Sequence, residues 1–355
     1  MKLRTQHRVN LGFDRFSGLY LWALFILVFG VWRPSLFLTS ATLHSVASAQ
    51  AVTAMLAIAV LIPIAAGVYD LSIGATINLS TIVVVWLQTL KHWNMWPAIG
   101  VAILASVLVG IVNGFVVVKL QVNSFIATLG MGTVITAVQD IVSGQNQPLP
   151  PTSSAWSSLT QRSVGGFEII VIYLLIMAVI VWWAMDHTPA GRYLFAIGGN
   201  PEAARLAGVD VGRYTWLSLI ASSTICGVAG VFYASQTGPS LTFGEALLLP
   251  AFAAVFLGST QLKPGRFNLW GTLIAIYVLA TGVKGLQLVT GVQWLNDMFN
   301  GVALIGAVSF AIWRQRVSAG RAAAERTAAT AGQSSGPAPA TEGAGTPSQV
   351  PTATT

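Results

Sequence analysis

Apolar stretches separated by short polar breaks run along the first 313 positions of the chain. Each stretch is about 20 residues long, which is the length that an α-helix needs to cross the hydrocarbon core of a bilayer. The pattern predicts ten membrane spans, at residues 18–32, 43–67, 71–90, 96–118, 124–143, 168–186, 214–236, 246–262, 267–289 and 294–313. We therefore expect an all-α fold, a polytopic helical membrane protein with about ten transmembrane helices.

The polar segments around these spans divide the chain into three parts. Residues 1–17 form a basic N-terminus, and residues 18–313 form the membrane domain. Residues 314–355 are mostly Ala, Gly, Ser, Thr and Pro, so they cannot bury enough apolar surface to fold and are predicted to be a disordered tail. With ten spans, 14 of the 18 lysines and arginines lie on the side of the N-terminus. Because basic residues favour the inner side of a membrane, both termini and residues 188–213 are expected in the cytoplasm.

Composition restricts the classes of function that the chain can have. It is 54% hydrophobic and 8% charged, whereas soluble domains carry about 25% charged residues. The net charge of +7 therefore reflects topology rather than nucleic-acid binding. The chain contains no GxxxxGK followed by Ser or Thr, no HExxH and no GxSxG, and its four histidines are scattered. We therefore predict no catalytic residue, no metal ligand and no cofactor in this chain, and no nucleic acid among its partners.

Residues 188–213 form a compact polar segment between two apolar spans. Asn200 is a preferred N-cap, Pro201 suits the first helical position, and Gly208 can end a helix in the left-handed conformation. These start and stop signals predict a helix over residues 201–207. Two turns do not persist alone in water, so the apolar face of this helix needs a surface to pack against. That face consists of Ala203, Leu206 and Ala207. The helix either simply links two spans or docks on another chain.

Several polar residues interrupt the apolar spans, where they must face protein or water. Asp70 either caps a tight turn between two helices or takes a direct part in gating. Neutral hydroxyl and amide groups can exchange hydrogen bonds with a polyol without trapping it, although each one alone is explained equally well by a hydrogen bond between helices. As a set, these residues predict a translocation path lined by Asp70, Ser72, Asn78, Asn113, Thr128, Thr133, Thr136 and Asn300.

Four stretches in order along the chain resemble one known family. GRYLFAIGGNPEAARLAG at residues 191–208 resembles the cytoplasmic signature of the membrane permeases of ribose-type ABC importers, which serve ribose, xylose, arabinose, galactose and related small polar solutes. YDLSIGA at 69–75 resembles the family's IDLSVGS, and NGFVVVKLQV at 113–122 resembles NGLLVAKL. SFIATLGMG at 124–132 resembles PPFIATLGT. The resemblance covers nearly the whole membrane domain.

The resemblance implies a permease subunit of a binding-protein-dependent ABC importer in the plasma (inner) membrane, conducting a monosaccharide or related polyol. It implies four partners: a second permease copy in a homodimer or a paralogous heterodimer, a dimer of ATP-binding subunits, an external solute-binding protein, and the lipid bilayer. ATP and Mg would bind to the ATP-binding subunit, so this chain would not be an enzyme. The family's coupling helix maps onto Gly199, Asn200, Pro201, Glu202, Ala203, Ala204, Arg205 and Gly208.

One stretch departs from the family pattern. Where the family has GGTSLxGGxG, this chain has LGSTQLKPGRFNLWG at residues 257–271, which introduces Lys263, Pro264 and Arg266. The two cations suit a second cytoplasmic contact, with the ATP-binding partner or with lipid headgroups. The main alternative for the whole chain is a stand-alone secondary carrier or facilitator for a small polar solute. Such carriers often show inverted repeats and ion-coupling charges inside the membrane, and the sequence shows neither clearly.

Overall fold

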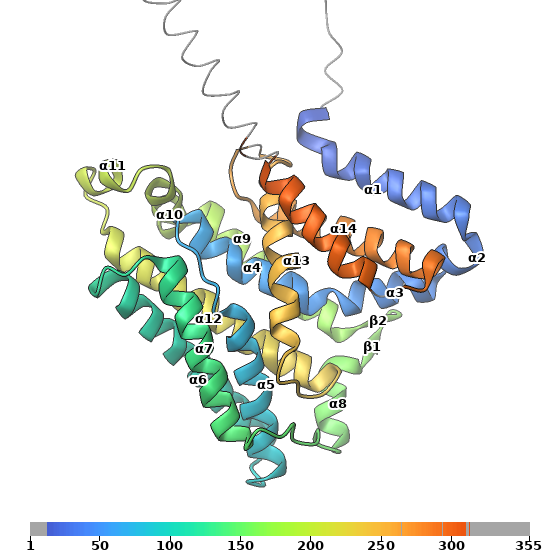
Figure 1. The fold of residues 1–355 in the computed structure, drawn as a ribbon, viewed down its shortest axis with the longest axis horizontal. Coiled ribbons are helices and arrows are strands. Elements are labelled where there is room, and N and C mark those ends of the chain that lie inside the picture. The colour runs from blue at the N-terminus through green and yellow to red at the C-terminus, as the bar shows by residue number, and fades with distance from the viewer. Residues whose placement is uncertain (1–12, 264, 293, 310–311, 313–355) are drawn as a thin grey trace, which may run out of the picture. The chain divides into compact units, whose positions relative to one another are not determined.

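The structure is a computed structural model that describes residues 13–263, 265–292, 294–309 and 312 (Figure 1). The described residues from 13 to 309 belong to one compact unit. Most of the N-terminal segment 1–17, the end of the last predicted span, Pro264 and the predicted disordered tail over 314–355 lie outside the described residues.

Helices make up almost all of the regular structure of this unit. In chain order they are α1 (Phe13–Trp32), α2 (Pro34–Phe37), α3 (Ser40–Ala49), α4 (Ala51–Ala65), α5 (Ile73–Thr89), α6 (Met95–Gly114), a π-helical turn (Phe115–Lys119), α7 (Ser124–Ser143), α8 (Ser154–Gln161), α9 (Ile169–His187), α10 (Pro189–Gly199), α11 (Pro201–Leu206), α12 (Val211–Gln236), α13 (Phe243–Gly258) and α14 (Leu269–Thr290). Residues 294–309 are also helical. A short antiparallel hairpin, β1 (Ser163–Val164) with β2 (Phe167–Glu168), precedes α9.

Six helical segments in the described part of the chain are long and apolar enough to cross a membrane. They are Ser40–Ala65, Met95–Lys119, Ser124–Ser143, Ile169–His187, Val211–Gln236 and Leu269–Thr290, and three shorter apolar helices are Phe16–Trp32, Ile73–Thr89 and Phe243–Gly258. The predicted class, an all-α multi-pass membrane protein, is therefore confirmed. The count of ten spans stays a prediction.

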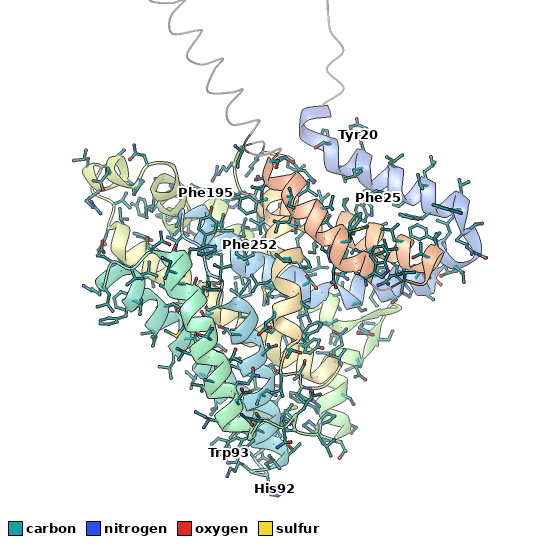
Figure 2. The ribbon with its side chains drawn as sticks, viewed as in Figure 1. Tyr20, Phe25, His92, Trp93, Phe195 and Phe252 are labelled. Carbon is teal, nitrogen blue, oxygen red and sulfur yellow. The ribbon has the colours of Figure 1, made fainter. Side chains whose placement is uncertain are left out.

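Two helices form the centre of the unit. Every residue of α4 is buried, which fits a helix that is apolar on all sides. α4 packs against α9, α12, α13 and α14, and α12 packs in addition against α5 and α6. Figure 2 shows side chains filling the space between these helices, with Phe252 of α13 in the interior. The lipid-facing positions are therefore on the outer helices, while α4 contacts only protein.

Glycines allow two close backbone contacts that shape this interior. At Gly74 of α5, a Cβ atom would lie 2.9 Å from the carbonyl oxygen of Gly244 in α13, so these two helices touch through their backbones. At Gly198 of α10, a Cβ atom would collide with the carbonyl oxygen of Ala65 at the end of α4. Larger residues at Gly74 or Gly198 would push the helices apart.

The structure differs from the sequence prediction mainly in short polar segments. The predicted span 246–262 is wrong at its end, because α13 stops at Gly258. The Asn268 side chain binds the carbonyls of Gly258 and Gln261, so residues 259–263 and 265–268 form a folded connection instead of a helix. α8, in the connection between α7 and α9, was not predicted because its eight residues are too polar to resemble a span.

Candidate functional site

Asp70 lies in the connection between α4 and α5 and is buried, with 1% of its surface exposed. Its Oδ1 atom accepts hydrogen bonds from the Ser72 hydroxyl at 2.6 Å and the Ser72 backbone N–H at 3.1 Å. Its Oδ2 atom accepts a hydrogen bond from the Ser222 hydroxyl of α12 at 3.0 Å. Among the described residues, Asp70 forms no ion pair. The carboxylate therefore fixes the turn before α5 to α12, while the N-cap position of α5 is Ser72. Capping and gating by Asp70 both stay predictions.

The same connection is held from two further helices. Asn113 of α6 donates to the Ser72 hydroxyl at 2.8 Å. Thr128 of α7 accepts from the backbone N–H of Leu71 at 3.0 Å and donates to the carbonyl of Ser124 at 2.7 Å. Four predicted path residues, Asp70, Ser72, Asn113 and Thr128, therefore meet around one segment, which we call the Asp70 cluster.

Asn78 of α5 organises a second polar cluster. Its amide donates to the carbonyl of Leu241 at 3.0 Å, and its Oδ1 atom accepts from the N–H of Gly244 at 2.7 Å. Gln139 of α7 donates to the same Leu241 carbonyl at 3.0 Å. This Asn78 cluster (Asn78, Gln139, Leu241 and Gly244) ties α5 and α7 to the start of α13.

The other three predicted path residues lie apart from both clusters. The Thr133 side chain is exposed and donates to the carbonyl of Gly130 in its own helix at 2.7 Å. Thr136 is half-buried and donates to Gly132 of the same helix at 3.0 Å. Asn300 is half-buried on the helical segment 294–309. Conversely, Ser222 and Gln139 belong to the clusters, and their only sequence signal is a polar residue within an apolar span.

The short helix predicted on the cytoplasmic side is present as α11. The Asn200 side chain accepts a hydrogen bond from the Ala203 backbone N–H at 3.0 Å, and Pro201 occupies the first turn. The helix ends at Leu206, one residue before the predicted end, and Gly208 follows with a φ of 83°. Glu202 and Arg205, which form an exposed ion pair at 2.9 Å, lie on its surface. The predicted roles of Asn200 as N-cap, Pro201 in the first turn and Gly208 in the left-handed conformation are therefore confirmed.

The apolar face of α11 has no covering surface among the described residues. Leu206 is 90% exposed, and Ala203 and Ala207 are exposed as well. Ala204 is the residue that seats the helix on the rest of the chain, with 5% of its surface exposed. Gly199, just before the helix, is also exposed and open. The face expected to need a packing partner is thus available to another chain.

Residues 188–213 contain a second helix that the sequence reasoning missed. α10 begins after Thr188, whose hydroxyl accepts a hydrogen bond from the Gly191 N–H at 3.4 Å, and Pro189 occupies its first turn. The Thr188–Pro189 pair is the same kind of start signal as Asn200–Pro201 and could have revealed this helix. α10 and α11 together form one element, which we call the coupling element, at the opposite end of the helices from the connection of α5 with α6 (Figure 1).

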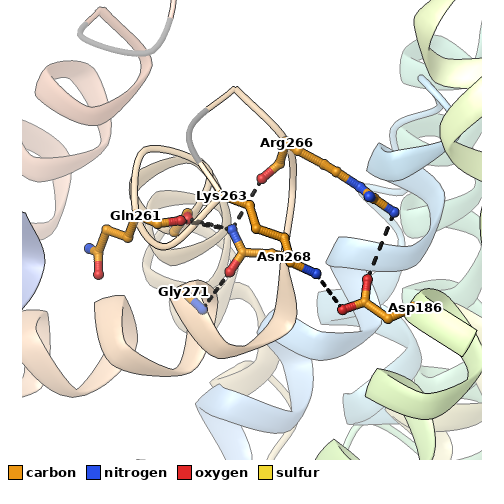
Figure 3. A network of polar contacts seen from close by, with 7 residues as sticks. Asp186, Gln261, Lys263, Arg266, Asn268 and Gly271 are labelled. Atoms are coloured by element: carbon orange, nitrogen blue, oxygen red, sulfur yellow. Dashed lines mark hydrogen bonds and ion pairs between the residues drawn. The ribbon is translucent and has the colours of Figure 1, made fainter. Parts of the chain in front are cut away.

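The two cations of the unusual 257–271 stretch pair within the chain. The Lys263 ammonium lies 2.6 Å from Oδ2 of Asp186, and the Arg266 guanidinium lies 3.8 Å from Oδ1 of the same residue (Figure 3). Asp186 belongs to the last turn of α9. These charges therefore already have a partner in this chain, and their predicted contact with another subunit or with lipid stays a prediction.

Apolar helices long enough to span a membrane, with polar clusters buried between them and a short exposed helix on a polar connection, define the class of multi-pass helical membrane proteins. The model of the family described as branched-chain amino acid transport system / permease component matches residues 42–308. The chain belongs to this family.

Curated relatives match over most of their length. The chain is 28% identical to the fructose import permease protein of Rhizobium meliloti over 307 residues, which are 83% of this chain and 84% of the relative. It is 25% identical to the D-allose transport system permease protein of Escherichia coli (strain K12), covering 83% of this chain and 91% of the relative. It is 29% identical to the ribose import permease protein of the same strain, covering 77% and 86%. No solved structure matches the chain.

Proposed function

We propose that this chain is the permease subunit of a binding-protein-dependent ABC importer and forms the membrane path for a monosaccharide or related polyol. The observation that carries the proposal is the similarity, over 77% to 83% of this chain, to permeases named for fructose, D-allose and ribose. The description of the family names branched-chain amino acids, but the two clusters contain no pair of opposite charges that could bind both the ammonium and the carboxylate of such a solute. Asp70 is the one charged member of the two clusters, and both its oxygens are already bonded within the fold.

The buried polar groups suit a solute rich in hydroxyls. Among the described residues, Asn113 Oδ1, Gln139 Oε1 and Ser223 Oγ are buried without a hydrogen-bond partner. Each of these oxygens can accept a hydrogen bond from a sugar hydroxyl, and an uncharged acceptor releases the sugar again at little cost. All three residues lie on helices that surround the α4–α5 connection and the Asn78 cluster. These groups support a neutral path, and a sugar is the solute class that they fit best.

The energy for transport would come from ATP hydrolysis in an ATP-binding subunit that binds the coupling element. The exposed apolar face of α11 is the docking surface in this proposal, and Asn200, Pro201 and Gly208 shape it. A second permease copy, an external solute-binding protein and cytoplasmic termini complete the proposed assembly. Movement of the coupling element then alternates access to the path between the two sides of the membrane.

Transport in liposomes tests this proposal directly. The chain is reconstituted with and without its ATP-binding subunit, and uptake of labelled ribose, fructose and leucine is measured with the binding protein outside. We expect sugar uptake that requires both the ATP-binding subunit and ATP. Rapid sugar movement down its gradient by the chain alone would instead establish the facilitator alternative. Uptake of leucine without any sugar would overturn the proposed solute class.

A further inference from the structure

In the connection between α13 and α14, the described residues 259–263 and 265–268 fold around one side chain. The Asn268 amide nitrogen lies 3.1 Å from the carbonyl oxygen of Gly258, 3.0 Å from that of Gln261 and 3.1 Å from that of Arg266. Its Oδ1 atom accepts a hydrogen bond from the N–H of Gly271 at 2.8 Å and so caps α14 (Figure 3). The connection therefore has a defined shape, and it holds the end of α13 and the start of α14 together.

This connection is joined to α9 through Asp186. The Asp186 side chain is 18% exposed, while those of Lys263 and Arg266 are 48% and 44% exposed. Ion pairs that are this accessible to water stabilise a fold only slightly. Their main effect is on position. The single carboxylate of Asp186 pairs with both Lys263 and Arg266 and so sets where the connection lies relative to α9.

Arg266 also joins the connection to the coupling element. Its guanidinium lies over the ring of Phe195, 3.8 Å from the ring centre. Phe195 belongs to α10, which leads into α11 through the single residue Asn200. α10 is also held by the surrounding helices: Leu194 and Ile197 are buried, and Gly198 lies against the backbone of Ala65 at the end of α4. A displacement of α11 therefore moves α10 and, with it, the partner of Arg266.

α13 extends from this connection to the Asn78 cluster. Its 16 residues run from Gly258, whose carbonyl Asn268 binds, back to Phe243 beside Gly244, whose N–H donates to Asn78. A helix of this length spans about 24 Å. α13 is one continuous helix that contains Pro250, so a shift at its Gly258 end that this proline does not absorb changes the position of Gly244 and its hydrogen bond to Asn78.

We propose that Asp186, Lys263 and Arg266 form a charged clamp that transmits movement of the coupling element through α13 to the Asn78 cluster. The three residues act as positioning residues, since none of them belongs to the two polar clusters. This inference rests on the proposed function, because it assigns a role to the movement that an ATP-binding subunit would cause. It also gives a reason for the unusual 257–271 stretch, which supplies both cations.

Hydrogen exchange of the full chain in nanodiscs tests the clamp without transport. In Asp186→Asn, we expect amides of residues 259–263, 265–268 and α10 to exchange several-fold faster, because Asp186 holds Arg266 and Arg266 in turn contacts Phe195 of α10. The matched control is Lys119→Gln, which removes an exposed lysine that forms no ion pair within the described part of the chain. Exchange rates in Asp186→Asn that equal those of the control would overturn the clamp, whatever the chain transports.

The number of sugar molecules moved per ATP hydrolysed tests the transmission. In the complete importer, we expect Asp186→Asn to lower this ratio about fivefold while ATP hydrolysis continues. Asp186→Lys and Lys263→Asp should each lower it, and the double variant, which restores one ion pair with reversed charges, should recover most of the loss. A purely structural role would change the amount of folded chain and leave the ratio unchanged.

The two proposals fail in different ways. A wild-type complex without ATP-driven sugar uptake overturns the proposed function, and the exchange rates still decide whether the clamp ties the connection to α10. A wild-type complex that transports sugar, with an Asp186→Asn ratio within about twofold of it, overturns the transmission. Faster exchange combined with an unchanged number of sugar molecules moved per ATP would show that the clamp stabilises the fold without transmitting movement. That result would also overturn the inference.

Discussion

Leu206 offers the most direct test of the coupling element. It is 90% exposed, the highest value among the large apolar side chains that the structure describes. Replacing it with alanine removes three carbon atoms that touch little in this chain, so the free energy of unfolding should change by no more than about 0.5 kcal/mol. If the ATP-binding subunit covers this side chain, the same truncation costs about 2 kcal/mol of binding free energy, at about 0.8 kcal/mol for each carbon removed.

That free energy corresponds to a dissociation constant about 30-fold larger. The assay is a titration of the labelled ATP-binding subunit onto the chain in nanodiscs, together with a measurement of the unfolding temperature. Leu149→Ala is the matched control, because Leu149 is 81% exposed on the connection between α7 and α8. Equal dissociation constants for the Leu206→Ala and Leu149→Ala variants would refute the docking role. A lowered unfolding temperature with Leu206→Ala would show that the side chain packs within this chain instead.

Three further predictions follow from the same contacts. Asn268→Ala should lower the free energy of unfolding by about 2 to 4 kcal/mol, measured by thermal unfolding in detergent, because it leaves several buried backbone groups unpaired; an unchanged midpoint would contradict this. Gly198→Ala should displace α10 and reduce ATP-driven uptake, whereas Gly100→Ala, where a Cβ atom meets nothing within 4 Å, should not; equal uptake by both variants would refute the close contact. Reversing the charge of Glu202 or Arg205 should reduce uptake and transport-linked ATP hydrolysis while the chain remains inserted, as checked by membrane fractionation; normal uptake in both variants would remove these side chains from the mechanism.

Local sequence signals predicted those elements whose geometry depends on neighbouring residues. The predicted span 124–143 coincides with α7, Ser124–Ser143, because a mostly apolar stretch of spanning length follows Asn123, which caps the helix. The start of α11 was likewise predictable from Asn200 and Pro201. The prediction failed at the end of α13, where the span was extended over Ser259, Thr260 and Gln261 although the helix stops at Gly258. The side chain of Asn268, which folds the chain there, lies beyond that predicted span.

In the candidate site, too, some features were predictable from local sequence and others depended on distant residues. Its residue types were predictable, since polar groups inside apolar spans are few, but their grouping was not. Asp70 and Ser222 are 152 positions apart, and Ser72 and Asn113 are 41 apart, yet both pairs are hydrogen-bonded. Helical periodicity places a residue on one side of its own helix and contains no information about which other helix packs there. Thr133 and Thr136 lie apart from the clusters for this reason.

The sequence by itself determined that the chain is a helical membrane protein and where the capped helix on the polar 188–213 connection begins. These properties depend on the length of apolar runs and on hydrogen bonds between residues only three positions apart. Only the tertiary structure decided that Lys263, 77 positions from Asp186, pairs with it, and that Leu206 faces outward. Such contacts form when helices distant in sequence pack together, because burial and pairing are properties of the assembled fold rather than of any one segment.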